Sequence, residues 1–150
     1  MTSRKLIKTV AFPARSKPHM LRVSPDGKEV WVQTAEANTN VVLSADDLSV
    51  LSTEPTGKSP VTNAWTPDRR YSIVTNSQDT VAQIFDARTF KEVKRLTIGQ
   101  GGSNVGFSKD GKTAFIAVTR ANTVAVIDVQ KLALTSHIKA GKDPQGLIVR

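Results

Sequence analysis

The sequence predicts an all-β protein that is built from one repeated unit. Glycines recur every 42 residues, at Gly57, Gly99 and Gly141. Aspartates keep the same interval, at Asp26, Asp68 and Asp110. Short runs of β-branched and aromatic residues alternate with Gly, Pro, Asn and Asp, and no segment keeps the helical period of about 3.6 residues. Because separate columns share one spacing, we interpret 42 residues as a structural repeat.

The middle unit shows how one repeat is organised. Its four runs are expected to be strands, and they cover Val61–Trp65, Tyr71–Thr75, Val81–Phe85 and Phe90–Ile98. In the first and third units, the gap between the first two runs carries an Asp-Gly pair, which favours a tight hairpin turn. Four antiparallel strands at a period of about 40–45 residues are typical of one blade of a β-propeller.

Apolar residues in matching columns are expected to pack between neighbouring blades. Two bulky columns are Val23/Trp65/Phe107 and Trp31/Ile73/Phe115. Both tryptophans are therefore predicted to be core residues. The spacing within the units also differs in one place, because six positions separate Thr80 from Asp86 and five separate Thr123 from Asp128. This difference predicts a β-bulge in one unit.

The period divides the chain into three whole blades and two incomplete ones, about 3.5 blades of 42 residues in all. The whole blades are expected at residues 15–56, 57–98 and 99–140. Residues 1–14 are expected to be the fourth strand of a preceding blade, and residues 141–150 the first strand of a next, incomplete blade. A closed propeller typically has about four to eight blades. We therefore expect either remaining blades in the same polypeptide, with this chain a segment of a larger propeller, or self-association that completes a ring.

Composition excludes several classes of site. The chain has 21 Lys and Arg against 13 Asp and Glu, which gives a net charge of +8. It has no cysteine, and this excludes Cys-based zinc sites, Fe–S clusters, covalently attached c-type haem and disulfide scaffolds. No apolar run approaches the ~20 residues of a membrane span, and the N-terminus shows no secretory signal.

No catalytic or metal-binding set is recognisable. The two histidines, His19 and His137, fall in different columns and have no neighbouring carboxylates in the sequence. The recurring aspartates are explained as turn residues. No nucleophile elbow or phosphate-binding loop motif is present, since no helix is expected after the glycine-rich stretch at 99–102. The sequence therefore favours a non-enzymatic protein without a cofactor or metal.

The candidate binding residues lie on one predicted face. In a propeller, the loops between blades and the loops between second and third strands meet on the same side, called here the loop face. The candidates for ligand or partner binding on this face are Arg15, Lys17, His19, Lys58, Gln100, Asn104, Arg120, Lys142 and Gln145. Other cations fall on the opposite face and the rim, so the positive charge is spread. It permits polyanion or DNA binding through phosphates, but aromatic residues are only 5% and offer no evident base-stacking platform.

The repeat resembles the YVTN-type β-propeller repeat. The residues that carry the resemblance are Gly57 with Pro60, Ser24–Lys28, Ile73–Asn76 and Asn122–Asp128. The third unit departs from the pattern, with Gly-Gln-Gly-Gly at 99–102 in place of Gly-x-x-Pro and Phe-Ile-Ala-Val at 115–118.

The resemblance is specific for the fold and leaves function open. Propellers with this repeat include surface-layer and adhesion-like proteins, lactonase-like enzymes, DNA-binding periplasmic proteins and a haem-carrying domain. It implies a periplasmic or extracellular location, and His19 is the candidate axial ligand if haem is bound. We expect a non-enzymatic scaffold whose loop face binds a ligand or a partner protein. The alternatives are a DNA-binding propeller and a lactonase-like or haem-carrying propeller domain.

Overall fold

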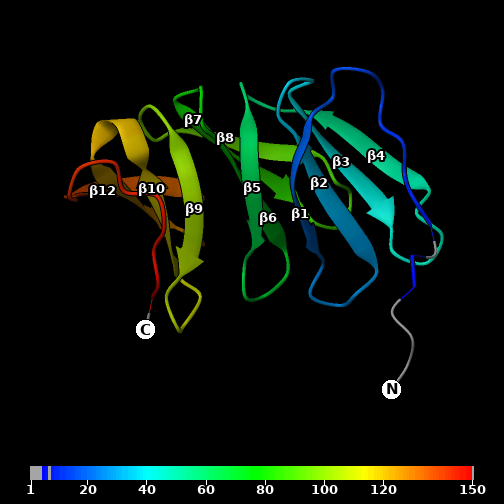
Figure 1. The fold of residues 1–150 in the computed structure, drawn as a ribbon. Coiled ribbons are helices and arrows are strands. Elements are labelled where there is room, and N and C mark those ends of the chain that lie inside the picture. Colours follow the sequence, from blue (N-terminus) through cyan, green and yellow to red (C-terminus); the bar gives the residue numbers. More distant parts are fainter. Residues whose placement is uncertain (1–4, 7, 150) are drawn as a thin grey trace.

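The computed structural model describes residues 5–6 and 8–149, and residues 1–4, 7 and 150 lie outside that description. Its strands form three four-stranded antiparallel sheets (Figure 1). Blade 1 contains β1 (Pro18–Val23), β2 (Glu29–Thr34), β3 (Thr39–Ser44) and β4 (Val50–Pro55). Blade 2 contains β5 (Pro60–Trp65), β6 (Tyr71–Asn76), β7 (Val81–Asp86) and β8 (Glu92–Thr97). Blade 3 contains β9 (Gly102–Phe107), β10 (Thr113–Val118), β11 (Thr123–Asp128) and β12 (Ala133–Lys139).

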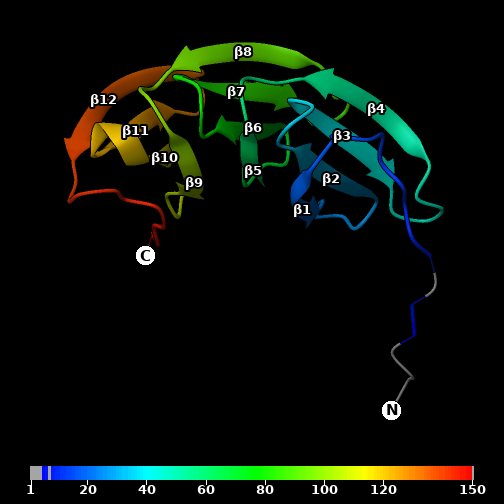
Figure 2. The ribbon, with the colours of Figure 1, turned by 45° about the horizontal axis from the view of Figure 1, so that its top comes forward.

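The three blades stand side by side in an arc. The first strands β1, β5 and β9 pack next to one another on the concave side, and β4, β8 and β12 run along the convex rim (Figure 2). Each strand pairs with its sequence neighbour, so every blade is a simple meander. The predicted fold class, an all-β chain of four-stranded antiparallel blades, is confirmed.

Short turns with a left-handed residue connect the first and second strands of each blade. Gly27 and Gly111 have φ of 77° and 71°, and Arg69 at the matching position of blade 2 has φ of 62°. Serine or threonine closes each turn; the Ser24 hydroxyl donates to Asp26 Oδ1 at 2.7 Å. The Asp-Gly pairs therefore form the turns that the sequence predicted.

The interfaces between blades differ in chemistry. Blades 2 and 3 share an apolar cluster that includes Ile73, Ile84, Ile116 and Ile127, all buried. Blades 1 and 2 share an aromatic cluster around Trp31, which is 0% exposed. Its ring packs edge-on against Trp65, Phe85 and Phe90, with centroids 5.6, 6.3 and 5.9 Å away. Trp31 is thus a core residue as predicted, and Trp65 packs against it half-buried.

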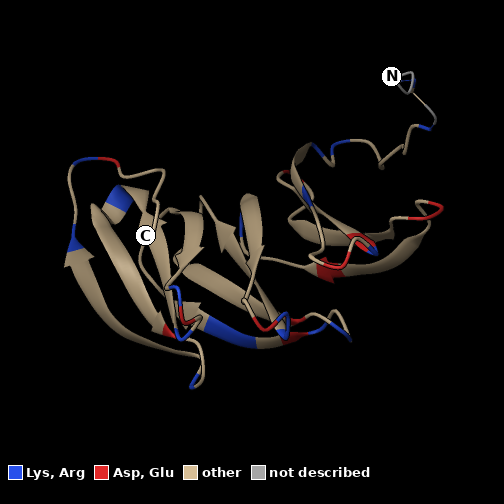
Figure 3. Cartoon of the chain, turned by 90° about the horizontal axis from the view of Figure 1, so that it is seen from below, with Lys and Arg blue, Asp and Glu red and all other residues tan. Residues whose placement is uncertain are grey.

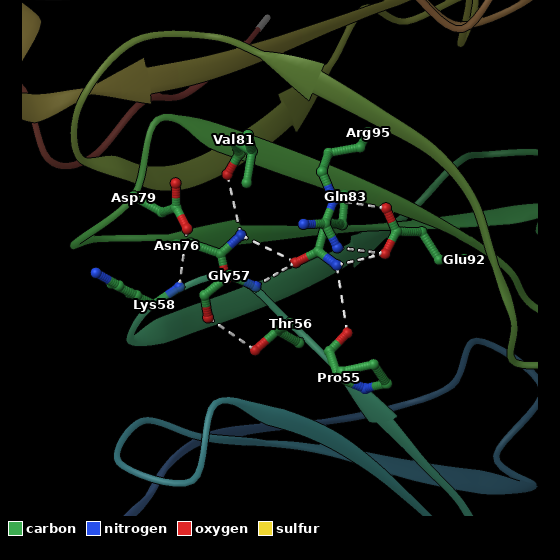
Figure 4. A network of polar contacts seen from close by, with 10 residues as sticks. All are labelled: Pro55, Thr56, Gly57, Lys58, Asn76, Asp79, Val81, Gln83, Glu92 and Arg95. Carbon is green, nitrogen blue, oxygen red and sulfur yellow. Dashed lines mark hydrogen bonds and ion pairs between the residues drawn. The ribbon is translucent and has the colours of Figure 1, made fainter.

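Buried amides fill the rest of the interface between blades 1 and 2. Gln33 Nε2 on β2 donates to Asn40 Oδ1 at 2.9 Å and to Asn63 Oδ1 of blade 2 at 3.2 Å. Gln83 on β7 is the centre of a second network, which reaches Pro55, Gly57, Asn76 and Glu92 (Figure 4). Hydrogen bonds across this interface fix the orientation of blade 1 against blade 2.

The N-terminal segment corrects one prediction. The described residues of 5–12 form no strand, although a fourth strand of a preceding blade was expected here. A fourth strand needs the third strand of its own blade as a hydrogen-bond partner, and the described chain offers none at this place. Instead, Val10 and Phe12 pack on Val32, Val41 and Leu43, the apolar side of blade 1 that faces away from blade 2.

The C-terminal segment corrects a second prediction, because residues 141–149 form no strand either. The segment nevertheless takes the place of a first strand beside β9. The Ser103 hydroxyl donates to the Gln145 carbonyl at 3.1 Å, and Leu147 lies against Gly106. No second strand follows to complete a ladder.

The predicted bulge in a single unit is also wrong. Strands β7 and β11 are each six residues long and pair with β6 and β10 without a register shift. Thr80 belongs to the preceding turn, whereas Thr123 is the first residue of β11, which explains the different spacing. Bulges occur in all three blades instead, at the start of β1, β5 and β9 and between the third and fourth strands.

Candidate functional site

The same backbone hydrogen bonds build the loop face in every blade. The first residue of each turn between second and third strands donates to the residue that leads into the first strand. These bonds join Ala35 to Lys17, Ser77 to Ser59 and Thr119 to Gly101, each at 2.9 Å. The turns and the segments entering β1, β5 and β9 therefore lie together, as the propeller prediction required.

Left-handed residues occupy one column of this face. Lys17, Ser59, Gly101 and Asp143 have φ of 50°, 54°, 92° and 51°. Asparagine holds two of them, because Asn38 Oδ1 accepts from the Ser59 N–H at 2.8 Å and Asn122 Oδ1 accepts from the Asp143 N–H at 2.9 Å. These bonds connect one blade to the entry of the next and keep the face rigid.

A hollow of about 420 Å³ lies on the loop face between blades 1 and 2, and we call it the lysine hollow. Its lining residues are Lys17, Ala35, Glu36, Asn38, Lys58, Ser59 and Gln78. Among the described residues, Lys17, Lys58 and Glu36 take part in no ion pair. Their charges are available to a bound molecule, and the excess of lysine favours an anion.

A second hollow of about 350 Å³, the arginine hollow, lies on the concave side of the same face. It is lined by His19, Val61, Ser77, Gly101, Ser103, Thr119, Arg120 and Gln145. His19, Val61, Ser103 and Gln145 occupy one column of the repeat, and His19 and Val61 stand at the strand bulges. Bulges re-aim side chains, which is how this column comes to line the hollow.

The structure divides the nine predicted binding residues into three groups. Lys17 and Lys58 line the lysine hollow. His19, Arg120 and Gln145 line the arginine hollow. The remaining four, which line neither hollow, are Arg15, Gln100, Asn104 and Lys142.

Hydroxyl groups in both hollows were not predicted. They belong to Ser59 in the lysine hollow and to Ser77, Ser103 and Thr119 in the arginine hollow. Counting 84 residues from His19 reaches Ser103, so the repeat column held a signal for this one. Nothing in the pattern marked Ser59, Ser77 or Thr119.

The opposite face carries charge that is engaged in turns. Hydrogen bonds from the Ser24 hydroxyl and the Lys28 N–H hold the pKa of Asp26 below its ordinary value. Those from Ser108 and Lys112 lower the pKa of Asp110 in the same way. These carboxylates are ionised turn residues and are unsuited to act as acids near neutral pH. Figure 3 shows Lys and Arg interspersed with Asp and Glu, so positive charge forms no continuous stripe.

The histidines lie on different sides of the arc. His19 Nδ1 is 3.3 Å from the Val61 carbonyl oxygen on the concave side, and His137 Nε2 on β12 is 2.8 Å from that of Ile98. The described residues contain no group of three or more His, Cys, Asp or Glu side chains that could hold a metal ion. No helix among them has the length and apolarity to cross a bilayer.

Comparison of the whole fold with solved structures decides the architecture. The chain is similar to Kuenenia stuttgartiensis hydrazine synthase, with a TM-score of 0.80 and 23% identity over 93% of this chain and 40% of that one. It is similar to the RRP9 WD40 repeats, with a TM-score of 0.78 and 14% identity over 88% of this chain and 41% of that one. The fold is that of a β-propeller.

A third similar structure is a putative 6-phosphogluconolactonase from Bacteroides fragilis, with a TM-score of 0.74 and 20% identity over 87% of this chain and 41% of that one. This β-propeller chain thus spans about 40% of the length of the structures it matches and supplies about three blades. No protein-family model and no curated protein matches its sequence. At these identities the similarity establishes the fold alone.

Proposed function

We propose that this β-propeller is a non-enzymatic scaffold whose loop face binds an acidic segment of a partner protein. The observation that carries the proposal is the lysine hollow, where Lys17 and Lys58 from two blades face one space without an ion pair among the described residues. Asn38 and Gln78 add amide groups suited to a peptide backbone. The similarity to WD40 repeats supports a role in protein interaction.

The YVTN type and a periplasmic or extracellular location belong to the same proposal. They rest on the repeat sequence, in particular Ser24–Lys28, Ile73–Asn76 and Asn122–Asp128. A scaffold of this kind needs neither haem nor a metal for binding.

Further blades, in the same polypeptide or in another copy of the chain, are also part of the proposal. Leu21 and Val23 on β1 are 58% and 53% exposed. Their counterparts in blade 2 are Asn63, which is buried, and Trp65, which packs on Trp31 of the preceding blade. The apolar side chains on β1 therefore suit an interface with one more blade. Light scattering on the purified chain measures whether it associates, and a folded, soluble monomer would contradict association in trans.

DNA binding is the second candidate, and the net charge of +8 is the observation that favours it. The lactonase-like and haem-carrying alternatives have weaker support. His19 lines the arginine hollow, but no carboxylate does, so an acid–base pair is missing there. Lactone hydrolysis or a haem absorbance band that disappears in His19→Ala would favour them instead.

Binding of a short Glu/Ser-rich peptide and of single- and double-stranded oligonucleotides tests the proposal. The double variant Lys17→Gln/Lys58→Gln should weaken peptide binding about tenfold, or ~1.4 kcal/mol. The matched control Lys109→Gln/Lys112→Gln removes the same charge from the opposite face and should change peptide binding little. Equal losses in both variants would show that only net charge matters. Tighter, salt-dependent oligonucleotide binding would favour the DNA-binding alternative.

A further inference from the structure

We infer that Arg120 is the anchor for a small ligand carrying a carboxylate or phosphate group in the arginine hollow. This inference rests on the proposed binding role of the loop face and assigns a ligand class to its second hollow. Arg120 lies on η1 (Thr119–Ala121), the one helical segment in the part of the chain that the structure describes. It is at this point that blade 3 departs from the other two blades.

The turn that carries Arg120 differs from its counterparts in the other blades. Residues 35–38 and 77–80 form ordinary turns between the second and third strands, whereas blade 3 has a 3₁₀ helix there. Asn122 ends this helix with φ of 54°, and its N–H donates to the Thr119 carbonyl at 3.3 Å. A regular repeat that is broken at one place suggests a local role for the residue placed there.

The glycine-rich stretch at 99–102 is the second departure from the repeat, and it fits the first. Gly101 has φ of 92°, and a β-carbon there would lie 3.1 Å from the Arg120 backbone nitrogen and 3.3 Å from its Cγ. The Thr119 N–H donates to the Gly101 carbonyl at 2.9 Å. Lys17 and Ser59 occupy the matching positions in blades 1 and 2, so side chains are tolerated where no helix must approach. The absent side chain at Gly101 lets Arg120 lie close against this loop.

The chemistry of the hollow suits an anion. Arg120 is exposed, and among the described residues it takes part in no ion pair. No Asp or Glu lines the hollow. A guanidinium presents a planar fork of N–H donors that matches the two oxygens of a carboxylate or phosphate. Arg120 therefore offers an unused bidentate donor to a bound oxyanion.

The other lining groups suit the polar remainder of a ligand. The hydroxyls of Ser77, Ser103 and Thr119 donate to the carbonyls of Ser59, Gln145 and Pro144 at 3.2, 3.1 and 3.0 Å. Their protons are committed to the protein, so their oxygens remain as acceptors for ligand hydroxyl or amine groups. His19 and Gln145 complete the wall. A volume of about 350 Å³ is in the range of small-molecule sites.

Titration of the purified chain with small anions tests the inference. The probes are succinate and inorganic phosphate, followed by calorimetry and by backbone amide NMR shifts, with sodium chloride at matched ionic strength as reference. We expect saturable binding, with shifts concentrated at residues lining the arginine hollow. Tighter succinate binding identifies a carboxylate ligand, and tighter phosphate binding identifies a phosphorylated one.

Three variants isolate the role of Arg120. Arg120→Gln should weaken binding at least about tenfold, whereas Arg120→Lys keeps the charge without the fork and should lose less. Gly101→Ala keeps the guanidinium but forces its backbone away, so it should also weaken binding. Arg15→Gln removes a loop-face arginine that lines neither hollow and should leave affinity unchanged. Circular dichroism checks that each variant is folded.

Two results would overturn the inference: no saturable binding of either anion, or an Arg120→Gln affinity equal to that of Arg15→Gln. These outcomes are separable from failure of the proposed scaffold function. Peptide binding is measured on the same samples and depends on Lys17 and Lys58, which lie in the other hollow.

Discussion

The Gly57 N–H donates a hydrogen bond of 2.6 Å to Oε1 of Gln83, which joins the linker between blades 1 and 2 to the third strand of blade 2. The same side chain donates from Nε2 to the Pro55 carbonyl at 3.3 Å and to Glu92 Oε2 at 2.7 Å. Gln83 is 0% exposed. One amide therefore connects the end of the outer strand of blade 1, the linker and the outer strand of blade 2 (Figure 4).

Replacing Gln83 should destabilise the chain. Gln83→Leu leaves the buried Gly57 N–H without an acceptor, and a buried unsatisfied group costs about 1–3 kcal/mol. Urea unfolding followed by fluorescence measures the loss. Gln130→Leu, at an exposed position, is the matched control and should change the free energy of unfolding little. Equal stability of the two variants would show that Gln83 does not hold the linker.

Arg69→Gly should stabilise the chain. Arg69 has φ of 62° where the matching residues are Gly27 and Gly111. A left-handed residue with a side chain costs about 1–2 kcal/mol, and the extra entropy of glycine in the unfolded state offsets about 0.5–1 of this. A gain of about 0.5–1 kcal/mol is expected in urea unfolding.

Two further variants control this prediction. Arg69→Ala removes the charge but keeps the β-carbon, so it should give no comparable gain. Gly111→Ala should destabilise, since its β-carbon would lie 3.1 Å from Pro67 Cγ and its φ is 71°. If alanine and glycine at position 69 were equally stabilising, backbone strain would not be the cause.

The fold could be predicted from the sequence because the repeat repeats its physical causes. Asp26-Gly27 marks a turn wherever a left-handed residue is needed, and columns such as Trp31/Ile73/Phe115 mark the packed sides of the sheets. The terminal strands could not be predicted correctly, because hydrophobic pattern identifies a strand's side chains while a ladder also needs a partner. Val10 and Phe12 show this, since they bury themselves without forming a strand.

The candidate site was only partly predictable. Lys17 and Lys58 could be placed together because propeller topology brings the entries of neighbouring blades to one face. The 3₁₀ helix that carries Arg120 could not, because three residues show no helical period. The glycines at 99–102 were visible as a departure, but their fit against Arg120 depends on a distance that only the structure gives.

Trp31 should contribute more to stability than any exposed aromatic residue. Its ring contacts those of Trp65, Phe85 and Phe90, and it is 0% exposed. Trp31→Ala should cost about 3–5 kcal/mol, because it opens a cavity between blades 1 and 2. Trp31→Phe should cost less, since it keeps a ring and removes an indole N–H that has no hydrogen-bond partner among the described residues. A cost for alanine no larger than that for phenylalanine would contradict this packing role.

Glu54 should make stability depend on pH. Burial raises its pKa, but hydrogen bonds from the Lys91 ammonium and the Ser52 hydroxyl, both at 2.6 Å, lower it further, so the net pKa lies below the ordinary 4.5. Because the folded state holds the proton less tightly than the unfolded state, the carboxylate stabilises the fold fully above about pH 4.5. This contribution is lost as the pH falls through the lowered folded value.

Glu54→Gln tests the sign of this effect. At pH 7 the variant should be less stable than the parent chain by about 1 kcal/mol, the upper range for a partly exposed pair, since Lys91 is 67% exposed. The difference should shrink towards pH 3, where the parent carboxylate gains a proton in both states. Urea unfolding at pH 7, 5 and 3 measures it, and Glu36→Gln, which removes an exposed glutamate without an ion pair among the described residues, is the control. A difference that stayed constant or grew at low pH would mean that the ionised form of Glu54 does not stabilise the contact with Lys91.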